Sequence, residues 1–194
     1  MKSLLYGLIL AGGKSRRIGQ DKAKILFSGQ TFLHRSFSII NSYVSDVFVS
    51  VREDQKEEPE RAAFNLIIDR QSELGPAAGL IAAHRTYPEA AWLVVACDMP
   101  HLTSDDIALI IGERDDQMDA TAFLNAGQIY PEPLCAIYEP GTLDSFTDFV
   151  RRGGSSSPKL WLHSADTHLI TPISNRALQS INTAKDLKNL NSLG

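Results

Sequence analysis

A glycine-rich, cationic segment at residues 10–22 has the composition of a phosphate-binding loop. Gly12 and Gly13 let the backbone approach a ligand closely and direct successive N–H groups at an anion. Arg17 offers a planar guanidinium fork, and Lys22 offers a mobile point charge. Because backbone donors and cations are concentrated in one short loop, the segment predicts a triphosphate site.

The spacing of this segment matches neither of the two best-known phosphate loops. The P-loop pattern G-x-x-x-x-G-K-[ST], set with its lysine at Lys14, puts Leu8 where the first glycine belongs. No glycines here have the G-x-G-x-x-G spacing of dinucleotide-binding proteins. The alternative is a solvated turn, but residues 14–24 carry five cations against one anion. That local charge favours a bound anion.

A second candidate is the carboxylate of Asp98, which follows the apolar run at residues 92–97. Mg²⁺ in proteins prefers one or two carboxylates together with phosphate oxygens and retained waters. A carboxylate that emerges from a buried strand beside a triphosphate loop therefore predicts a magnesium ligand. The alternative is an Asp that caps the turn at Met99 and Pro100.

Asp69 occupies a similar position at the end of the apolar run 65–68, shortly before the sequence from Gly75 to Gly79. Proline at position 76 suits the first turn of a helix, where its missing N–H costs nothing. The functional interpretation places Asp69 beside the ligand. The alternative is a helix that begins at Pro76 with an ordinary Asp in the preceding loop.

Apolar runs of strand length alternate with helical patterns along the chain, as expected for a sheet covered on both faces. We expect strands at residues 4–10, 47–51, 65–68, 92–97, 120–124, 134–138 and 168–173, and helices at 32–40, 76–87, 104–112, 141–151 and 183–190. This pattern predicts a three-layer α/β/α, Rossmann-like fold with a mostly parallel sheet. Such sheets bind ligands at the carboxyl ends of their strands, where the polar residues above would lie.

Three of these motifs together resemble a known family. Residues 10–22 resemble the signature L-A-G-G-x-S-x-R-M-G-x-D-K of nucleotidyltransferases similar to molybdenum cofactor guanylyltransferase, also called molybdopterin-guanine dinucleotide biosynthesis protein A. Ile18 stands where that family most often has Met. Residues 97–100 match its C-D-x-P motif, and residues 75–79 resemble its G-P-L-A-G motif, with Ala77 in place of Leu.

The resemblance implies a nucleotidyltransferase fold and a set of roles. Arg17, Lys22 and Asp98 would be the catalytic residues, with Asp98 holding Mg²⁺ and Asp69 near the ribose or the reaction centre. The residues implied to bind the nucleotide are Leu10, Ala11, Gly12, Gly13, Lys22, Asp69, Gly75, Pro76 and Gly79.

The C-terminal half carries weaker signals. Residues 133–138 resemble the family's P-L-x-x-x-Y segment, and residues 180–186 resemble its N-x-N-T-P-E-D/E segment, with Ser180 in place of the first Asn. The resemblance implies that Ser180 and Asn182 contact the acceptor. Thr183 and Asp186 also form a capping box, so helix capping explains part of this motif. We expect one domain over residues 1–194, with a nucleotide-binding half at 1–112 and an acceptor-binding half at 113–194.

The resemblance implies transfer of GMP from GTP to the terminal phosphate of molybdopterin or its molybdenum-loaded form, with release of pyrophosphate. It also implies partner proteins that deliver or receive the labile cofactor. Two alternatives remain open at this point. One is the same chemistry with CTP or with a sugar or alcohol phosphate as acceptor. The other is a regulator that binds a nucleotide without turnover.

Composition excludes several other classes of protein. The chain has 194 residues and a formal net charge of −4, which gives no support for a nucleic-acid or anionic-membrane binder. Its two cysteines, Cys97 and Cys135, lie far apart in apolar runs, as expected of buried reduced thiols in a reducing compartment. No run approaches the ~18–20 apolar residues that a membrane-spanning helix needs. We therefore expect a cytoplasmic protein.

Overall fold

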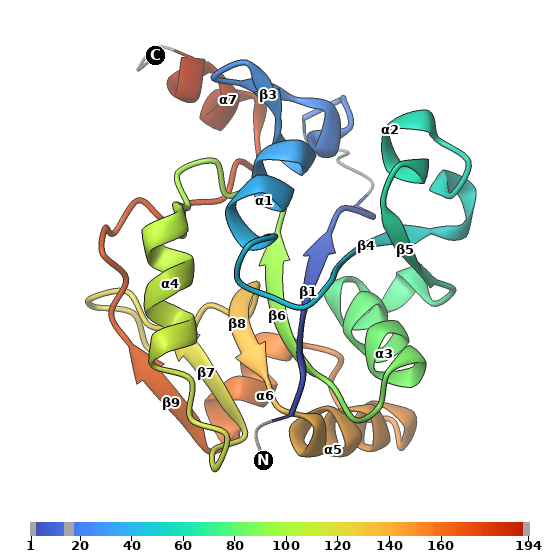
Figure 1. Ribbon diagram of the computed structural model, residues 1–194, viewed down its shortest axis with the longest axis vertical. Coiled ribbons are helices and arrows are strands. Elements are labelled where there is room, and N and C mark those ends of the chain that lie inside the picture. The colour runs from blue at the N-terminus through green and yellow to red at the C-terminus, as the bar shows by residue number, and fades with distance from the viewer. Residues whose placement is uncertain (1–2, 14–17, 192–194) are drawn as a thin grey trace.

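The computed structural model describes residues 3–13 and 18–191. The strands of its main sheet are β1 (Leu5–Leu10), β4 (Val47–Arg52), β5 (Asn65–Asp69), β6 (Ala91–Ala96), β7 (Ala120–Phe123), β8 (Cys135–Tyr138) and β9 (Thr167–Ile170). Within the described residues they are ordered β5-β4-β1-β6-β8-β7-β9 (Figure 1). The first four are mutually parallel. β8 runs antiparallel to both of its neighbours, so that β7 and β9 again run in the direction of β6.

Helices cover both faces of this sheet. The helices of the described residues are α1 (Phe32–Ile40), α2 (Pro59–Ala62), α3 (Pro76–Thr86), α4 (Ser104–Gly112), α5 (Pro140–Arg151), α6 (Pro158–Ser164) and α7 (Ala184–Asn191), with short 3₁₀ helices η1 (Lys22–Lys24), η2 (Glu53–Gln55) and η3 (Ser72–Leu74). Because successive strand residues point to opposite faces, Ile9 packs with α1 and α4 in one core cluster, whereas Leu8 packs with α3, α5 and α6 in another. The predicted three-layer α/β/α fold with a mostly parallel sheet is confirmed.

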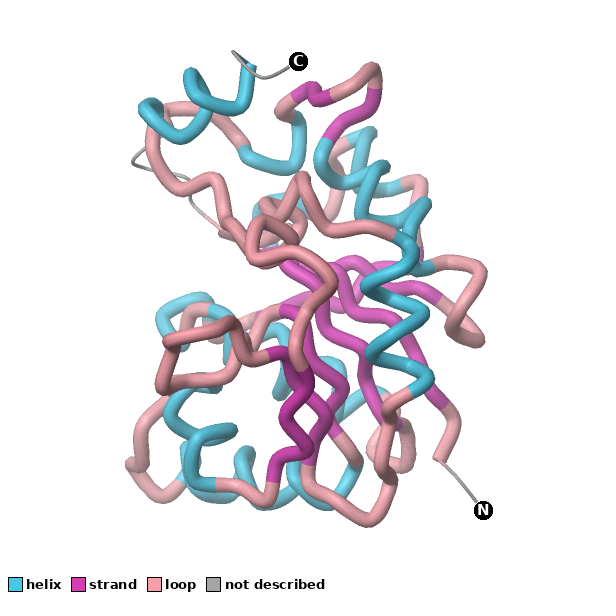
Figure 2. The backbone as a smooth tube through the Cα atoms, turned by 90° about the vertical axis from the view of Figure 1, so that its left-hand side faces the viewer, coloured by secondary structure: helices cyan, strands magenta, loops and turns pink. Residues whose placement is uncertain are grey.

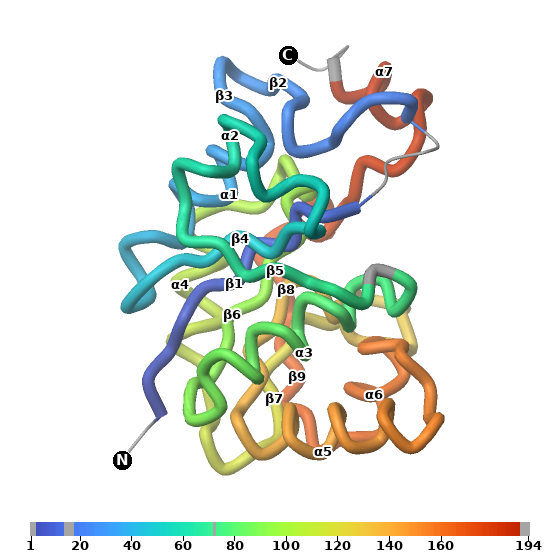
Figure 3. Tube along the Cα trace, turned by 90° about the vertical axis from the view of Figure 1, so that its right-hand side faces the viewer, coloured from blue at the N-terminus to red at the C-terminus, as the bar shows by residue number. Residues whose placement is uncertain are grey.

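A third, smaller core cluster joins two segments that are far apart in the sequence. Ile25 and Phe32 pack against Ile181 and Leu190 of the C-terminal segment. The small hairpin of β2 (Leu26–Phe27) and β3 (Gln30–Thr31) and helix α7 therefore lie together at one end of the sheet (Figures 1 and 3). This packing brings the end of the chain over the segment that follows the glycine-rich loop.

Local corrections concern the C-terminal half and the short elements. Helix α6, which lies near α5 on one face of the sheet (Figure 3), was not predicted, and the last sheet strand covers residues 167–170 rather than 168–173. Ser157 caps α6 by accepting a hydrogen bond from the backbone N–H of Leu160 at 3.3 Å, and Pro158 occupies its first position. Ser and Pro are as typical of a loop as of a helix start, and the helix has only seven residues. The sequence pattern of this segment therefore does not distinguish a loop from a short helix.

Strands and loops alternate with short helices throughout the tube view of Figure 2. In the residues that the structure describes, no helix combines the length and the apolar character needed to cross a membrane. The division of the chain into a nucleotide-binding half and an acceptor-binding half stays a prediction.

Candidate active site

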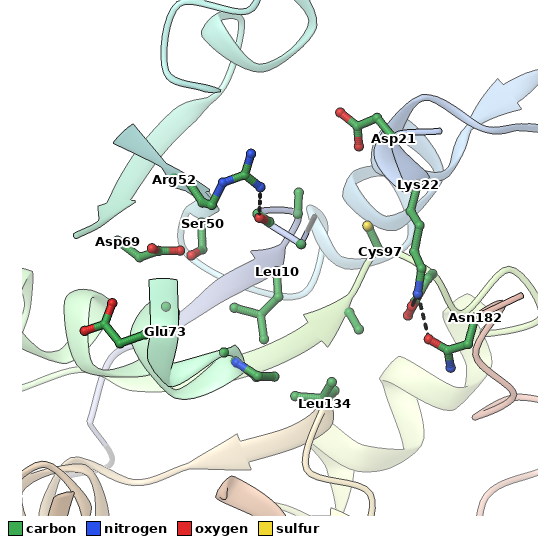
Figure 4. A pocket seen from close by; sticks show the side chains of 18 residues that line it. Leu10, Asp21, Lys22, Ser50, Arg52, Asp69, Glu73, Cys97, Leu134 and Asn182 are labelled. Atoms are coloured by element: carbon green, nitrogen blue, oxygen red, sulfur yellow. Dashed lines mark hydrogen bonds and ion pairs between the residues drawn. The ribbon is translucent and has the colours of Figure 1, made fainter. Parts of the chain in front are cut away.

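Four parallel strands end at one edge of the sheet and deliver side chains to a common cavity. Their register places Leu10 of β1 opposite Ser50 of β4 and Ala96 of β6, and it places Arg52 of β4 opposite Asp69 of β5. A cavity of about 590 Å³ lies over this edge (Figure 4). The site is therefore where an open α/β sheet is expected to bind its ligand.

The structure brings almost all of the predicted site residues to this cavity. Those that line it are Leu10, Ala11, Gly12, Gly13, Lys22, Asp69, Gly75, Pro76, Gly79, Asp98 and Asn182. Of the predicted residues that the structure describes, Ser180 alone is absent from the lining. It is half-buried and precedes the lining residue Asn182 by two positions. Arg17 lies outside the described residues. Four separate motifs thus share one cavity, while the role of each residue stays a prediction.

Lys22 connects three of the motifs. Its Nζ lies 2.5 Å from Oδ2 of Asp98 and donates a hydrogen bond of 2.7 Å to Oδ1 of Asn182 (Figure 4). The preceding residue, Asp21, caps η1 by accepting a hydrogen bond of 3.0 Å from the backbone N–H of Ala23. This cap defines the start of η1, whose first residue is Lys22. The ammonium group of Lys22 extends to Asp98, just after the end of β6.

Asn182 is held in place by its own segment. The backbone N–H of Ile181 donates to the carbonyl oxygen of Asp98 at 2.9 Å. Asp186 accepts hydrogen bonds from the backbone N–H groups of Asn182 and Thr183 at 3.0 and 2.8 Å. Bonds from the Thr183 side chain and from these two N–H groups lower the pKa of Asp186. The predicted capping box is therefore formed, and it orients Asn182 toward Lys22.

Asp98 has one carboxylate oxygen available for a further partner. Oδ2 is paired with Lys22, whereas Oδ1 is buried and has no hydrogen-bond partner in the described part of the protein. No group of three or more His, Cys, Asp or Glu side chains suited to a metal ion occurs among the described residues. A single carboxylate beside the predicted phosphate site fits Mg²⁺, which takes most of its ligands from phosphates and waters.

Cys97 precedes Asp98 and also lines the cavity. Burial, with a smaller contribution from the charge of Asp98, raises the pKa of this thiol to about 12. A cysteine that stays protonated at neutral pH is a poor nucleophile. Cys97 is therefore not a candidate nucleophile.

The opposite end of the cavity is built around Asp69. This residue is 7% exposed, and its Oδ1 is buried without a hydrogen-bond partner in the described residues. Burial raises the pKa of the Asp69 carboxyl, and the nearby charge of Arg52 acts in the opposite direction. Figure 4 shows Asp69, Ser50, Arg52 and Glu73 gathered on this side, away from Lys22 and Asn182.

Arg52 is the main polar residue of the cavity that the sequence did not reveal. One of its Nη atoms donates a short hydrogen bond to the carbonyl oxygen of Gly12, and its Nε lies 2.9 Å from Oδ1 of Asp54. It sits in no recognised motif. The available signal was its place at the end of a parallel strand, the same signal that pointed to Asp69. Other lining residues that were not predicted are Asp21, Ser50, Glu73, Ala96, Cys97 and Leu134.

Two glycines are required by close packing at this end of the cavity. A Cβ atom at Gly79 would lie 2.6 Å from Oγ of Ser50 and 2.7 Å from Cδ2 of Leu10. A Cβ atom at Gly12 would lie 3.3 Å from Oδ2 of Asp69. The absence of side chains lets α3 and the glycine-rich loop approach the strand ends, which keeps the Asp69 end of the cavity compact.

Comparison with known proteins identifies the family. Residues 7–173 match the family described as MobA-like NTP transferase domain. The chain belongs to this MobA-like family. It is 35% identical over 96% of its length to the molybdenum cofactor biosynthesis bifunctional protein of Synechocystis sp., and it spans about half (54%) of that longer relative. It is 29% identical to the molybdenum cofactor guanylyltransferase of a Shewanella species, over 79% of this chain and 78% of the relative.

The MobA-like fold is also found among solved structures. The structure of molybdopterin-guanine dinucleotide biosynthesis protein A from Archaeoglobus fulgidus superimposes with a TM-score of 0.78 over 97% of each chain, at 22% sequence identity. The family recognised from the motifs is therefore confirmed, and the chain is an enzyme of the nucleotidyltransferase type.

Proposed function

We propose that this chain transfers GMP from GTP to the terminal phosphate of molybdopterin or of its molybdenum-loaded form. Two of the relatives are named for molybdenum cofactor biosynthesis or guanylyl transfer, and the A. fulgidus structure is named for molybdopterin-guanine dinucleotide biosynthesis. The product is a dinucleotide-like cofactor, and pyrophosphate is released.

The contact of Lys22 with both Asp98 and Asn182 carries this proposal. It joins the glycine-rich loop, the C-D-x-P motif and the C-terminal motif at one point of the cavity. A regulator that only binds a nucleotide has no need of a carboxylate with a buried free oxygen at this point. Transfer between a triphosphate and a second phosphate does require charge compensation for both substrates.

The reaction is an in-line displacement at phosphorus. An oxygen of the acceptor phosphate attacks the α-phosphorus of the nucleotide, and the bond from that phosphorus to the bridging oxygen breaks. Both electrons of that bond leave with pyrophosphate. The second pKa of a phosphate monoester is about 6, so the nucleophile is already an anion at neutral pH and needs no general base. Catalysis then depends on positioning and on neutralisation of charge.

We call the part of the cavity around Lys22, Asp98 and Asn182 the Lys22 end. Its residues supply that neutralisation. Asp98 would hold Mg²⁺ through Oδ1, the oxygen without a partner in the described residues. A bound Mg²⁺ would offset negative charge on the triphosphate. Lys22 offers an ammonium group oriented by Asn182 toward the same point. Arg17 is proposed as a further phosphate ligand from the sequence motif alone.

The Asp69 end is proposed to bind the nucleoside. Its buried oxygen without a partner is an acceptor for a ribose hydroxyl or a base N–H group. Residues of the glycine-rich loop and of the turn at Gly75 and Pro76 also line the cavity. Ser180 and Asn182 are proposed to contact the acceptor.

Pyrophosphate release tests the proposal directly. The protein is incubated with Mg²⁺ and each of GTP, CTP, ATP and UTP, with and without molybdopterin, and with a sugar phosphate or an alcohol phosphate in parallel. We expect release with GTP and molybdopterin only. Release with CTP, or with a sugar or alcohol phosphate alone, would overturn the assignment of substrates. Tight binding of GTP without release in the presence of molybdopterin would favour a regulator.

A matched pair of lysine variants tests whether pyrophosphate release depends on this cavity. Lys22→Ala removes the ammonium group that contacts Asp98. Lys56→Ala removes an exposed ammonium group that pairs with Glu53 on the surface. Exposed ion pairs contribute little, so Lys56→Ala is expected to keep normal turnover. Equal activity of the two variants would contradict the role of Lys22.

Three further expectations stay predictions from the sequence. They are the binding of cofactor-handling partner proteins, a lack of affinity for nucleic acid or membranes, and a cytoplasmic location.

A further inference from the structure

Arg61, on the short helix α2, is fully buried (0% exposed) and does not line the cavity. Its guanidinium group contacts three parts of the chain. Nη2 donates to the carbonyl oxygen of Ala11 at 3.0 Å and lies 2.8 Å from Oδ2 of Asp21. Nη1 lies 2.6 Å from Oε2 of Glu58. No motif singled out this residue. The helix that carries it, α2, lies near β5 (Figure 1).

Two of these contacts are at the ends of the glycine-rich loop. Ala11 directly follows β1, where the loop begins, and Asp21 directly precedes Lys22, where it ends. One nitrogen atom, Nη2, binds both residues although they are ten positions apart in the chain. Asp21 also caps η1. The guanidinium group therefore sets the distance between the end of β1 and the helix that carries Lys22.

The surrounding charges explain why an arginine is needed. Glu58 pairs with both Arg61 and Nζ of Lys24, the latter at 3.1 Å, and Lys24 also pairs with Glu60 at 3.0 Å. The Arg fork can donate from different nitrogens in fixed directions, whereas a lysine offers one point charge on a flexible stem. A lysine at position 61 would preserve the charge and lose the simultaneous contact with Ala11, Asp21 and Glu58.

We propose that Arg61 is a positioning residue for nucleotide binding. By holding Ala11 and Asp21 together, it places Lys22 opposite Asp98 and presents the first glycines of the loop to the nucleotide. The inference rests on the proposed function, because it takes the cavity to be a nucleotide site. Arg61 itself touches neither substrate.

Arg114 provides a matched control within the same chain. It is also buried, and its guanidinium group makes a two-point contact with Glu139 at 2.6 and 2.8 Å. It donates in addition to the carbonyl oxygen of Ser3, just before the start of β1 and thus at the opposite end of the sheet from the cavity. An Arg→Lys change at either position disturbs a buried ion pair, but only Arg61 is linked to the glycine-rich loop.

The experiment compares Arg61→Lys with Arg114→Lys. Thermal unfolding is measured first without ligand, and then with Mg²⁺ and each of the four ribonucleoside triphosphates to obtain the dissociation constants. Steady-state turnover with GTP and molybdopterin follows. We expect both variants to lose stability. Only Arg61→Lys should raise the Kd and KM of the nucleotide, by about tenfold, because the loop groups that bind the nucleotide would lose their placement. The KM of the acceptor should change less than about twofold.

Asp21→Asn gives a second, independent variant. It keeps the shape of the side chain and removes the charge that Arg61 binds. We expect the nucleotide to bind more weakly to this variant as well. Because Arg61 and Asp21 are in direct contact, the effects of the double variant should be clearly less than the product of the single effects.

Different outcomes would contradict the positioning role of Arg61 and the proposed guanylyl transfer. Equal stability losses with an unchanged nucleotide Kd in Arg61→Lys would overturn the positioning role. Binding of another nucleotide in place of GTP would overturn the guanylyl assignment, and the same comparison with that nucleotide then decides the role of Arg61. If the unaltered protein bound none of the four triphosphates, both proposals would be wrong.

Discussion

The two ends of the cavity handle charge in opposite ways. At the Lys22 end, one cation contacts a carboxylate and an amide from distant parts of the chain at 2.5 and 2.7 Å, and the other oxygen of that carboxylate is buried without a partner in the described residues. At the Asp69 end, a buried carboxylate keeps one oxygen without a partner in the described residues, and Arg52 donates to the Gly12 carbonyl. The first arrangement suits the compensation of strong charge on phosphates. The second suits the recognition of hydroxyl and N–H donors.

The two ends of the cavity differ both in their electrostatics and in their packing. The Lys22 end is assembled by contacts across the sequence and keeps a cation beside its carboxylate. The Asp69 end is enclosed by α3, which approaches closely because Gly79 lacks a side chain. An unpaired buried carboxylate is costly unless a ligand supplies a hydrogen bond. We therefore expect substitution of Asp98 to affect mainly the rate, and substitution of Asp69 to affect mainly nucleotide affinity.

The largest effect is expected from Asp98→Asn. The amide keeps the size of the side chain, but it removes the charge that pairs with Lys22 and the proposed metal ligand. Loss of one such electrostatic contact lowers kcat on the order of 10²–10³-fold. Pyrophosphate release at saturating substrates measures it, with Asp105→Asn on the exposed start of α4 as control. Near-normal kcat in a correctly folded Asp98→Asn protein would contradict the role of the Lys22 end.

A smaller effect, on affinity, is expected from Asp69→Asn. The change removes a charged acceptor whose hydrogen bonds are worth about 1.5–3 kcal/mol, which corresponds to roughly a 10–100-fold weaker Kd for the nucleotide. kcat at saturating nucleotide should change much less than in Asp98→Asn. Titration calorimetry and steady-state kinetics provide the two values. A variant with normal affinity and reduced kcat would reverse the proposed roles of the two ends.

Gly79→Ala tests the packing that encloses the Asp69 end. The added methyl group would meet Ser50 and Leu10 at 2.6 and 2.7 Å, and overpacking of this kind costs about 1–3 kcal/mol in unfolding free energy. Gly13→Ala is the matched control, because a Cβ atom there meets nothing within 4 Å. Denaturant unfolding compares the two variants. Equal stability of both would show that the close approach of α3 is not required.

The smallest effect concerns pH and stability without a ligand. Because the pKa of Asp69 is raised in the fold, its ionised form costs stability above that pKa, and the cost disappears as the carboxyl is protonated at lower pH. Asp69→Asn should therefore raise the melting temperature at pH 7 by at most about 4 °C, a shift that ~1 kcal/mol produces in a chain of this size. The difference from the unaltered protein should narrow as pH falls from 7 toward 4. A difference that is independent of pH would argue against a desolvated charge at this position.

The motifs of the sequence identified one half of the site well. Leu10 to Gly13, Asp69 and Asp98 lie at the ends of parallel strands, and parallel strands necessarily align their carboxyl ends at one edge. Apolar runs and turn residues were therefore sufficient to place them together. Arg52 has the same position at the end of β4 but belongs to no motif, so its place at the strand end was the one signal that could have indicated it.

Contacts between distant segments could not be derived in the same way. The helix at residues 184–191 and the capping box before it are local features and were predictable from their own residues. That this segment packs on Ile25 and Phe32, and so brings Asn182 to Lys22, depends on side chains 160 positions apart. Arg61 reaches Ala11 and Asp21 for the same kind of reason.

The alternation of strands and helices and the family could be predicted from the sequence alone. These depend on periodicity, local charge and short motifs, which are properties of single segments. The tertiary structure alone decided which carboxylate is paired, which is buried without a partner, and which arginine spans the ends of the loop. These depend on packing between segments, because burial and pairing exist only after the segments have come together.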